Sequence, residues 1–122
     1  MARLFFFLGS VFAGLAVVMG AWGAHSDVLG EVQMLWIDKG VRYQMFHSLA
    51  ILCSALLIGS HKKIPVLAVA AAGCFVGGIV LFSGSLYCMA VSSTDLGLVT
   101  PVGGLLFLLG WLCLAFSAPG KR

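Results

Sequence analysis

LFFFLGSVFAGLAVVMGAWGAHS, residues 4–26, contains no Asp, Glu, Lys or Arg, and this stretch decides the class of the protein. Three more charge-free stretches follow at residues 43–61, 64–94 and 96–120. About 20 apolar residues cross the hydrocarbon core of a bilayer as a helix, so each stretch is long enough for one crossing. The sequence therefore predicts an all-α polytopic membrane protein, a four-helix transmembrane bundle. The predicted spans, within a single transmembrane domain at 1–122, are residues 4–24, 42–60, 65–90 and 98–117.

The composition agrees with this class. Hydrophobic residues make up 61% of the 122 residues and charged residues only 9%, whereas a soluble domain carries about 25% charged residues. So few charges cannot cover a globule in water, and lipid must cover the apolar surface instead. The net charge of +3 comes from basic residues that border the spans. No basic groove or stacking platform can be assembled from them, so we expect no nucleic-acid partner.

The distribution of Lys and Arg predicts the orientation in the membrane. Five basic residues fall on one side of the predicted spans and two on the other, together with all four acids. Since cytoplasmic loops carry the excess of Lys and Arg, we expect both termini and the middle loop on the cytoplasmic side, with the first span retained. The five are Arg3, Lys62, Lys63, Lys121 and Arg122; the two are Lys39 and Arg42.

The segment between the first two spans, residues 26–41, is amphipathic. Its apolar residues recur every three or four positions, and acidic residues occupy the other side. This pattern is typical of a short helix lying in the membrane interface, with Trp36 at headgroup depth. We therefore expect a short interfacial helix after the first span.

The third charge-free stretch is longer than a bilayer requires. Its 31 residues would extend about 46 Å as a continuous helix, whereas the hydrocarbon core is about 30 Å thick. The excess predicts either a helix that protrudes above the membrane or a break at Ser83-Gly84-Ser85. We expect protrusion.

Small residues indicate where the spans should pack. Helices in lipid associate through close approach of their backbones, which glycine permits. Gly73 and Gly77, four residues apart, mark such a seam in the third span. The glycines expected at helix contacts are Gly14, Gly20, Gly23, Gly73, Gly77, Gly84, Gly103 and Gly104.

Polar side chains are expected to gather near the outer leaflet. His25 ends the first predicted span and His47 lies about one turn inside the second, on the same face as Tyr43 and Gln44. Such a cluster either binds a ligand or fixes packing through hydrogen bonds between helices, and the sequence leaves both open. We expect one hydrogen-bonded group with His47 as its buried member and Arg42 at its rim. The candidate residues are His25, Arg42, Tyr43, Gln44, His47, Ser83, Ser85, Tyr87 and Thr100.

The sequence lacks the residue patterns that several kinds of chemistry require. No carboxylate lies inside a predicted span, which argues against a proton-coupled antiporter because that exchange needs one there. Two histidines without further ligands do not specify a metal site, and no Ser-His-Asp arrangement is readable. We therefore expect no enzyme, no metal and no cofactor.

Four motifs together resemble one known family. They are Gly-Ala-Trp-Gly-Ala-His at 20–25, Val-Arg-Tyr-Gln-Met-Phe-His at 41–47, Leu-Phe-Ser-Gly-Ser-Leu-Tyr at 81–87 and Thr-Pro-Val-Gly-Gly at 100–104. In order and spacing they resemble the domain of unknown function 423. Departures are small: Gly40 stands where alanine is common and Phe46 where tyrosine is common. The resemblance implies a four-span protein of the bacterial inner membrane without an established activity, and it places the polar candidates inside the family's motifs.

Two functional classes follow from this organisation. The first is a non-catalytic membrane module that binds a lipid, a small ligand or a partner near the outer leaflet. The second is a small channel or transporter acting as a homo-oligomer, because one four-helix unit encloses little pore. A continuous polar stripe across the bilayer would distinguish them, and the inner half of the sequence lacks one. The binding module is therefore favoured.

Overall fold

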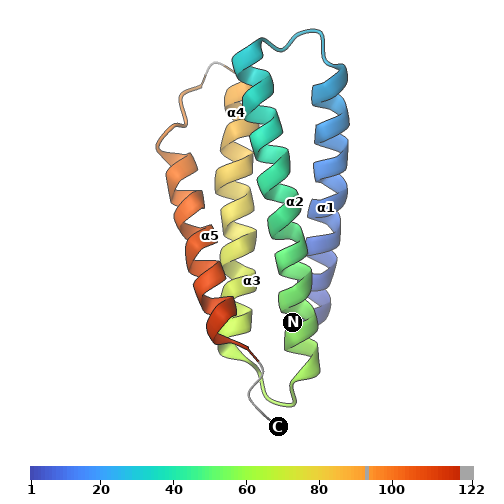
Figure 1. Cartoon of the computed structure of the whole chain (residues 1–122), viewed down its shortest axis with the longest axis vertical. Helices are drawn as coiled ribbons and strands as arrows, with labels where there is room; N and C mark the ends of the chain where they lie inside the picture. Colours follow the sequence, from blue (N-terminus) through green and yellow to red (C-terminus); the bar gives the residue numbers. More distant parts are fainter. Residues whose placement is uncertain (93, 119–122) are drawn as a thin grey trace.

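The computed structural model describes residues 1–92 and 94–118 (Figure 1). Four of its helical segments are long and apolar enough to cross a membrane, which confirms the predicted all-α architecture. The third segment is one rod built from α3, the π-helical turn η1 and α4. The elements are α1 (Ala2–His25), α2 (Glu31–Ser60), α3 (Val66–Gly78), η1 (Ile79–Ser83), α4 (Gly84–Val91) and α5 (Val99–Phe116).

No separate interfacial helix is seen after the first span, and that expectation is wrong. Residues 31–41 form the first turns of α2, which continues without interruption to Ser60. Apolar residues of the amphipathic pattern remain exposed on α2, Val32 at 54% and Leu35 at 67%, whereas Ile37 and Gly40 are buried against neighbouring helices. At 30 residues α2 is about 45 Å long, so its charged end extends past a hydrocarbon core of about 30 Å.

The third span is continuous through Ser83-Gly84-Ser85, so the break considered at that point does not occur. Instead the helix widens over Ile79–Ser83, where the Gly84 N–H bonds to the carbonyl of Ile79. A π-turn accommodates one extra residue inside an α-helix. The turn brings Ser83 to a buried position facing α2, where its hydroxyl bonds to the Gly40 carbonyl.

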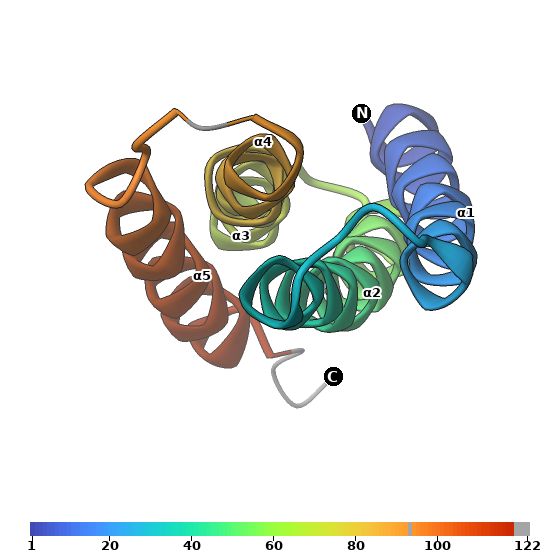
Figure 2. The same cartoon turned by 90° about the horizontal axis from the view of Figure 1, so that it is seen from above.

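The helices pack in an open order rather than as a closed bundle. Seen from above, α1 and α5 lie at opposite ends, with α2 and the α3–α4 rod between them (Figure 2). Helix α1 packs on α2 and only touches α3, whereas α5 packs chiefly on α3 and η1. The backbones of α2 and α5 make at most marginal contact. Both outer helices therefore leave most of their surface to lipid.

The core lies where α2, α3 and α5 meet. Phe75 is fully buried at its centre, packed with Ile51, Ile79 and Phe107. Phe75 also meets the ring of Trp111 edge-on at a centroid distance of 5.1 Å. These aromatic contacts hold the rod against α5 and set the position of His47, which stacks on Phe107.

Some of the glycines expected at helix contacts do lie there. A Cβ atom added to Gly103 would lie 2.4 Å from the backbone nitrogen of Phe82, and one on Gly23 would lie 2.7 Å from Ile37. Added Cβ atoms on Gly20 and Gly77 would meet side chains at 3.3 and 3.2 Å. Helix backbones approach closely at these points because no side chain intervenes.

The other expected glycines lie elsewhere. Cβ atoms on Gly14, Gly73 and Gly84 would meet nothing within 4 Å, and one on Gly104 would make only ordinary contact with Phe82 at 3.9 Å. Glycine spacing indicates which residues share a helix face but not which face meets a neighbour. The close approaches that the sequence did not single out are at Gly9, Gly40, Gly78 and Gly110.

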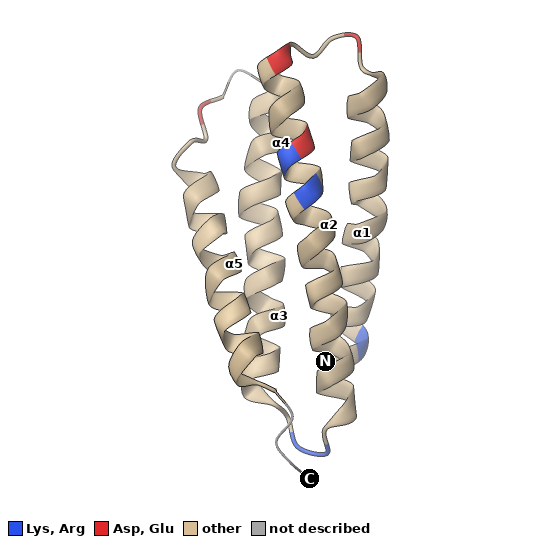
Figure 3. Cartoon of the chain, viewed as in Figure 1, with Lys and Arg blue, Asp and Glu red and all other residues tan. Residues whose placement is uncertain are grey.

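Charges separate to the two ends of the described chain (Figure 3). Arg3, Lys62 and Lys63 lie at the end where α1 begins, which we call the basic end. All four acids lie toward the opposite, acidic end, together with Lys39 and Arg42. Lys121 and Arg122, counted above for the orientation, lie outside the described residues.

Candidate functional site

Gln44 connects three helices. It is 3% exposed, and its side-chain nitrogen donates to the carbonyl of Phe12 on α1 at 2.7 Å. Its side-chain oxygen accepts from the hydroxyl of Tyr87 on α4, also at 2.7 Å. Both ends of the amide are therefore satisfied inside the membrane domain, where an unsatisfied polar group is costly.

His47 connects α2 to α5. The Trp111 indole N–H donates to its Nε2 at 3.0 Å, so Nε2 carries no proton. The proton is then on Nδ1, which lies 2.6 Å from the Tyr43 carbonyl and donates to it. The ring also stacks on Phe107 with centroids 3.6 Å apart. This geometry uses both nitrogens of a neutral imidazole.

Two serines make the remaining polar links of the cluster. Ser83, 1% exposed, donates to the Gly40 carbonyl at 2.7 Å and so joins η1 to α2. Ser85 and Thr100 share a hydrogen bond of 2.6 Å between α4 and α5. Every buried side-chain nitrogen or oxygen within the described residues has a hydrogen-bond partner.

The cluster thus differs from the expected single group. The structure brings Gln44, His47, Ser83, Ser85, Tyr87 and Thr100 into several separate hydrogen-bonded links between helices. Tyr43 instead offers its carbonyl to His47 within α2 and packs its ring on Phe82. His25 is exposed at the end of α1, and Arg42 pairs instead with Asp38 at 3.0 Å in an exposed ion pair.

His47 lies near the middle of α2. It is about 24 Å from the first residue of α2 and about 20 Å from the last, at 1.5 Å per residue. The charged first turns of α2 precede the predicted span that begins at residue 42, so a position about one turn inside that span stays a prediction.

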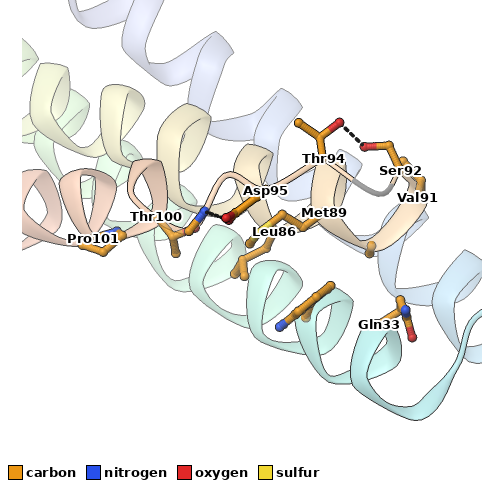
Figure 4. Close-up of a pocket in the computed structure, with 12 residues that line it drawn as sticks. Gln33, Leu86, Met89, Val91, Ser92, Thr94, Asp95, Thr100 and Pro101 are labelled. Atoms are coloured by element: carbon orange, nitrogen blue, oxygen red, sulfur yellow. Dashed lines mark hydrogen bonds between the residues drawn. The ribbon is translucent and has the colours of Figure 1, made fainter.

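A groove opens at the acidic end because α5 begins lower than the neighbouring helices end. In Figure 1 the upper end of α5 lies below the upper ends of α2 and α4. The uncovered space has a volume of about 710 Å³, and Figure 4 shows side chains from α2, α4, the 94–98 segment and α5 around it. We call it the acidic-end groove. Its lining residues are Gln33, Trp36, Leu86, Met89, Ala90, Val91, Ser92, Thr94, Asp95, Gly97, Thr100 and Pro101.

A second groove lies between α2 and α5. This α2–α5 groove has a volume of about 580 Å³ and is lined mainly by aromatic and aliphatic side chains. Pro101, in the first turn of α5, lines both grooves. The backbones of α2 and α5 stay apart, and side chains from both helices line the space between them. They include Tyr43, His47, Phe107 and Trp111.

Polar side chains of the acidic-end groove come from α2, from the segment around Asp95 and from the start of α5. Asp95 is exposed, and its Oδ1 accepts from the Gly97 N–H at 3.0 Å (Figure 4). Trp36 and Gln33 face the groove from α2. No set of three His, Cys, Asp or Glu residues able to hold a metal occurs within residues 1–92 and 94–118. The arrangement therefore suits an amphipathic ligand with a small polar end.

Comparison with protein families decides where the chain belongs: the family described as "Protein of unknown function (DUF423)" matches residues 19–104. The chain belongs to the DUF423 family. The UPF0382 inner membrane protein YgdD of Escherichia coli (strain K12) is 40% identical over 120 residues, covering 96% of this chain and 90% of the relative. The UPF0382 membrane protein of Haemophilus influenzae is 41% identical over 105 residues, covering 84% and 82%. The UPF0382 membrane protein YwdK of Bacillus subtilis is 37% identical over 121 residues, covering 95% and 96%.

Membership of the DUF423 family agrees with the four long apolar helices, and the chain is a multi-pass inner-membrane protein. No solved structure matches it. The family match includes all nine polar candidates, whereas Trp111 lies beyond it.

Sequence reasoning missed two parts of this DUF423 site. Trp111 was not among the candidates, although a tryptophan deep in a span signals a buried indole N–H that needs a partner. The acidic-end groove was missed as well, and only Thr100 of its lining residues was a candidate. The signal for the groove was the late start of the fourth span relative to Val91, where α4 ends.

Proposed function

We propose that this DUF423 protein is a non-catalytic membrane module that binds one lipid molecule. The polar end of the lipid lies in the acidic-end groove, and one acyl chain lies in the α2–α5 groove. The observation that carries the proposal is that Pro101 lines both grooves. A groove with polar side chains next to an apolar groove matches an amphipathic molecule better than a compact soluble one.

The size and lining of both compartments support this assignment. Ligand pockets have volumes of about 300–1,000 Å³ and mostly apolar walls, and both grooves fall in this range. Leu86, Met89 and Ala90 give the acidic-end groove an apolar wall. Aromatic rings line the α2–α5 groove, where they offer flat contact surface to a hydrocarbon chain.

The hydrogen-bonded cluster supports a binding module over a channel. Gln44, His47 and Tyr87 use their polar groups in bonds to neighbouring helices. Such groups fix the helices and offer little to a passing ion. Neither a catalytic step nor an oligomeric pore is therefore part of the proposal.

We also propose that the termini and the middle loop face the cytoplasm, which places both grooves in the outer half of the membrane. Arg3, Lys62 and Lys63 lie together at the basic end, and the acids lie at the other. Short cytoplasmic loops carry the excess of Lys and Arg.

The test blocks the junction of the two grooves. Pro101→Trp places a large ring where they meet, and Val102→Trp is the matched control, because Val102 is 50% exposed and lines neither groove. Protein purified in detergent is incubated with phospholipid, and native mass spectrometry counts the lipid molecules retained. We expect the wild-type chain and the control to retain one lipid. The amount of lipid retained by Pro101→Trp should be at least about tenfold lower, which is the change that 1.4 kcal/mol produces.

Thermal unfolding in the same detergent shows whether each variant is folded. Equal lipid retention by the folded Pro101→Trp and Val102→Trp variants would contradict the proposal. Absence of any specifically retained lipid on the wild-type chain would contradict it as well.

A further inference from the structure

We propose that the lipid carries an amine headgroup, and that Asp95 and Trp36 recognise its ammonium group. The inference rests on the function proposed above and specifies the class of lipid. It follows from the charges that line the acidic-end groove and from how they are arranged along α2 and the segment before α5.

Asp95 supplies the charge. Among the described residues that line the groove, it is the one acid, and no Lys or Arg lies with it. Its Oδ1 accepts the Gly97 N–H, a bond that fixes the carboxylate in position and leaves Oδ2 uninvolved. An ammonium group offers three donors, and a bond between two charged partners is about twice as strong as a neutral one. An anionic headgroup would instead meet a like charge.

Trp36 supplies an aromatic surface at the same end. It is half-buried on α2 and lines the groove opposite the 94–98 segment. A cation over an indole ring is attracted by the negative face of the ring. Gln33, three residues earlier on the same side of α2, adds an amide that can accept a further ammonium hydrogen.

The phosphate of the same headgroup has its own partners. A groove of about 430 Å³ along α2 shares Trp36 with the acidic-end groove and is lined by Asp38, Lys39 and Arg42. Arg42 is partly neutralised by Asp38 at 3.0 Å, whereas Lys39 has no carboxylate within 4 Å among the described residues. Positive charge therefore lies one turn of α2 from Trp36.

This order of charges matches a zwitterionic amine phospholipid. Its ammonium group lies between Asp95 and Trp36, its phosphate lies toward Lys39, and its acyl chain passes Pro101 into the α2–α5 groove. Phosphatidylglycerol has a phosphate and no ammonium group, so it gains nothing from Asp95. The pair of lipids therefore separates headgroup recognition from general lipid binding.

The test is a competition in detergent between phosphatidylethanolamine and phosphatidylglycerol with identical acyl chains at equal concentration. Native mass spectrometry of the full chain gives the ratio of the two bound lipids. We expect about a tenfold preference for phosphatidylethanolamine in the wild-type chain, equal to one charged contact of 1.4 kcal/mol. Asp95→Asn should bring the ratio close to one, because asparagine keeps the bond to the Gly97 N–H and removes the charge.

Asp27→Asn is the matched control. Asp27 is exposed at the same end and lines none of the three grooves, so its removal changes the net charge equally and should leave the ratio unchanged. Trp36→Leu should lower the preference severalfold. Retention of one lipid without headgroup preference, still abolished by Pro101→Trp, would overturn this inference and leave the proposed function standing. An equal loss of preference in Asp27→Asn and Asp95→Asn would also overturn it.

Discussion

Each buried polar side chain among the described residues bonds to a different helix or to the backbone of its own helix. Gln44 illustrates the first case, since its amide joins α1 to α4 through Phe12 and Tyr87. Ser54 illustrates the second, with its hydroxyl bonded to the Ala50 carbonyl at 2.9 Å. Because the hydrophobic effect does not drive helices together inside lipid, such bonds and close packing hold them. The polar candidates therefore contribute first to the arrangement of the helices.

The bond between His47 and Trp111 gives a prediction at this scale. A double-mutant cycle with His47→Leu and Trp111→Phe removes the polar contact from either side and keeps much of the apolar volume. Bonds of this type average about 0.6 kcal/mol and reach about 1.7 kcal/mol in membranes, and we expect a coupling energy in this range from unfolding in detergent. A coupling energy of zero would show that the bond contributes nothing to stability.

A control for this cycle is the pair of His47→Leu and Tyr87→Phe. The two side chains share no hydrogen bond, since Tyr87 donates to Gln44. Their effects should therefore add.

At the residue scale, the sequence identified which side chains are polar but not their partners. The helical phase of α2 placed Tyr43, Gln44 and His47 together, and all three lie at contacts with neighbouring helices. The hydrogen-bond partners depend on the rotation and height of α5 relative to α2. The sequence pattern of a single helix does not predict this placement. Trp111 illustrates this. Its indole bonds to His47 because the packing of Phe75 and Phe107 positions α5 beside that residue.

Among the elements, α5 is the shortest span, with 18 residues against 30 in α2. Its length of about 27 Å is slightly less than the hydrocarbon core of about 30 Å, whereas its neighbours extend beyond the core. The acidic-end groove is a direct result of this difference. Close approach to the α3–α4 rod compensates for the small contact of α5 with α2.

The two adjacent glycines of α5 give a prediction for this contact. Gly103→Ala should destabilise the fold by about 1–3 kcal/mol, because the new methyl group would lie 2.4 Å from the backbone nitrogen of Phe82. Gly104→Ala is the matched control and should be tolerated, since the nearest atom is 3.9 Å away. Unfolding of both variants in detergent measures the difference, and equal stability would show that the helices do not approach at Gly103.

At the element scale, the sequence predicted the four helices and misplaced one boundary. Absence of charge marks the part of a helix that lies in lipid, but it does not mark where the helix ends. Helix α2 continues past Arg42 because Ile37 and Gly40 pack on Gly23 and Tyr87 above the hydrocarbon core. The π-turn at Ile79–Ser83 was also not predictable, since it depends on the fit of the rod between α2 and α5 rather than on local sequence.

At the scale of the whole molecule, the separation of charges predicts the orientation. In a variant whose native cysteines are replaced by serine or alanine, single cysteines are introduced by Asp27→Cys and Lys62→Cys. A membrane-impermeant maleimide applied to intact cells should label the first and spare the second if the basic end faces the cytoplasm, as we propose.

Permeabilised cells provide the control, in which both positions should react. Labelling of both cysteines in intact cells would contradict the four-span topology. Labelling of Lys62→Cys alone would show the reverse orientation and would place the two grooves in the inner half of the membrane.

The open order of the helices also has a consequence for biosynthesis. Each span after the first packs on one that was synthesised before it: α2 on α1, the α3–α4 rod on α2, and α5 on α3 and η1. No contact between α1 and α5 has to close the structure. Chains with contacts between neighbouring segments pay little loop-closure entropy. As the ribosome delivers one hairpin after the other, each new span therefore finds its docking surface already in the bilayer, and the protein can assemble in the order in which it is translated.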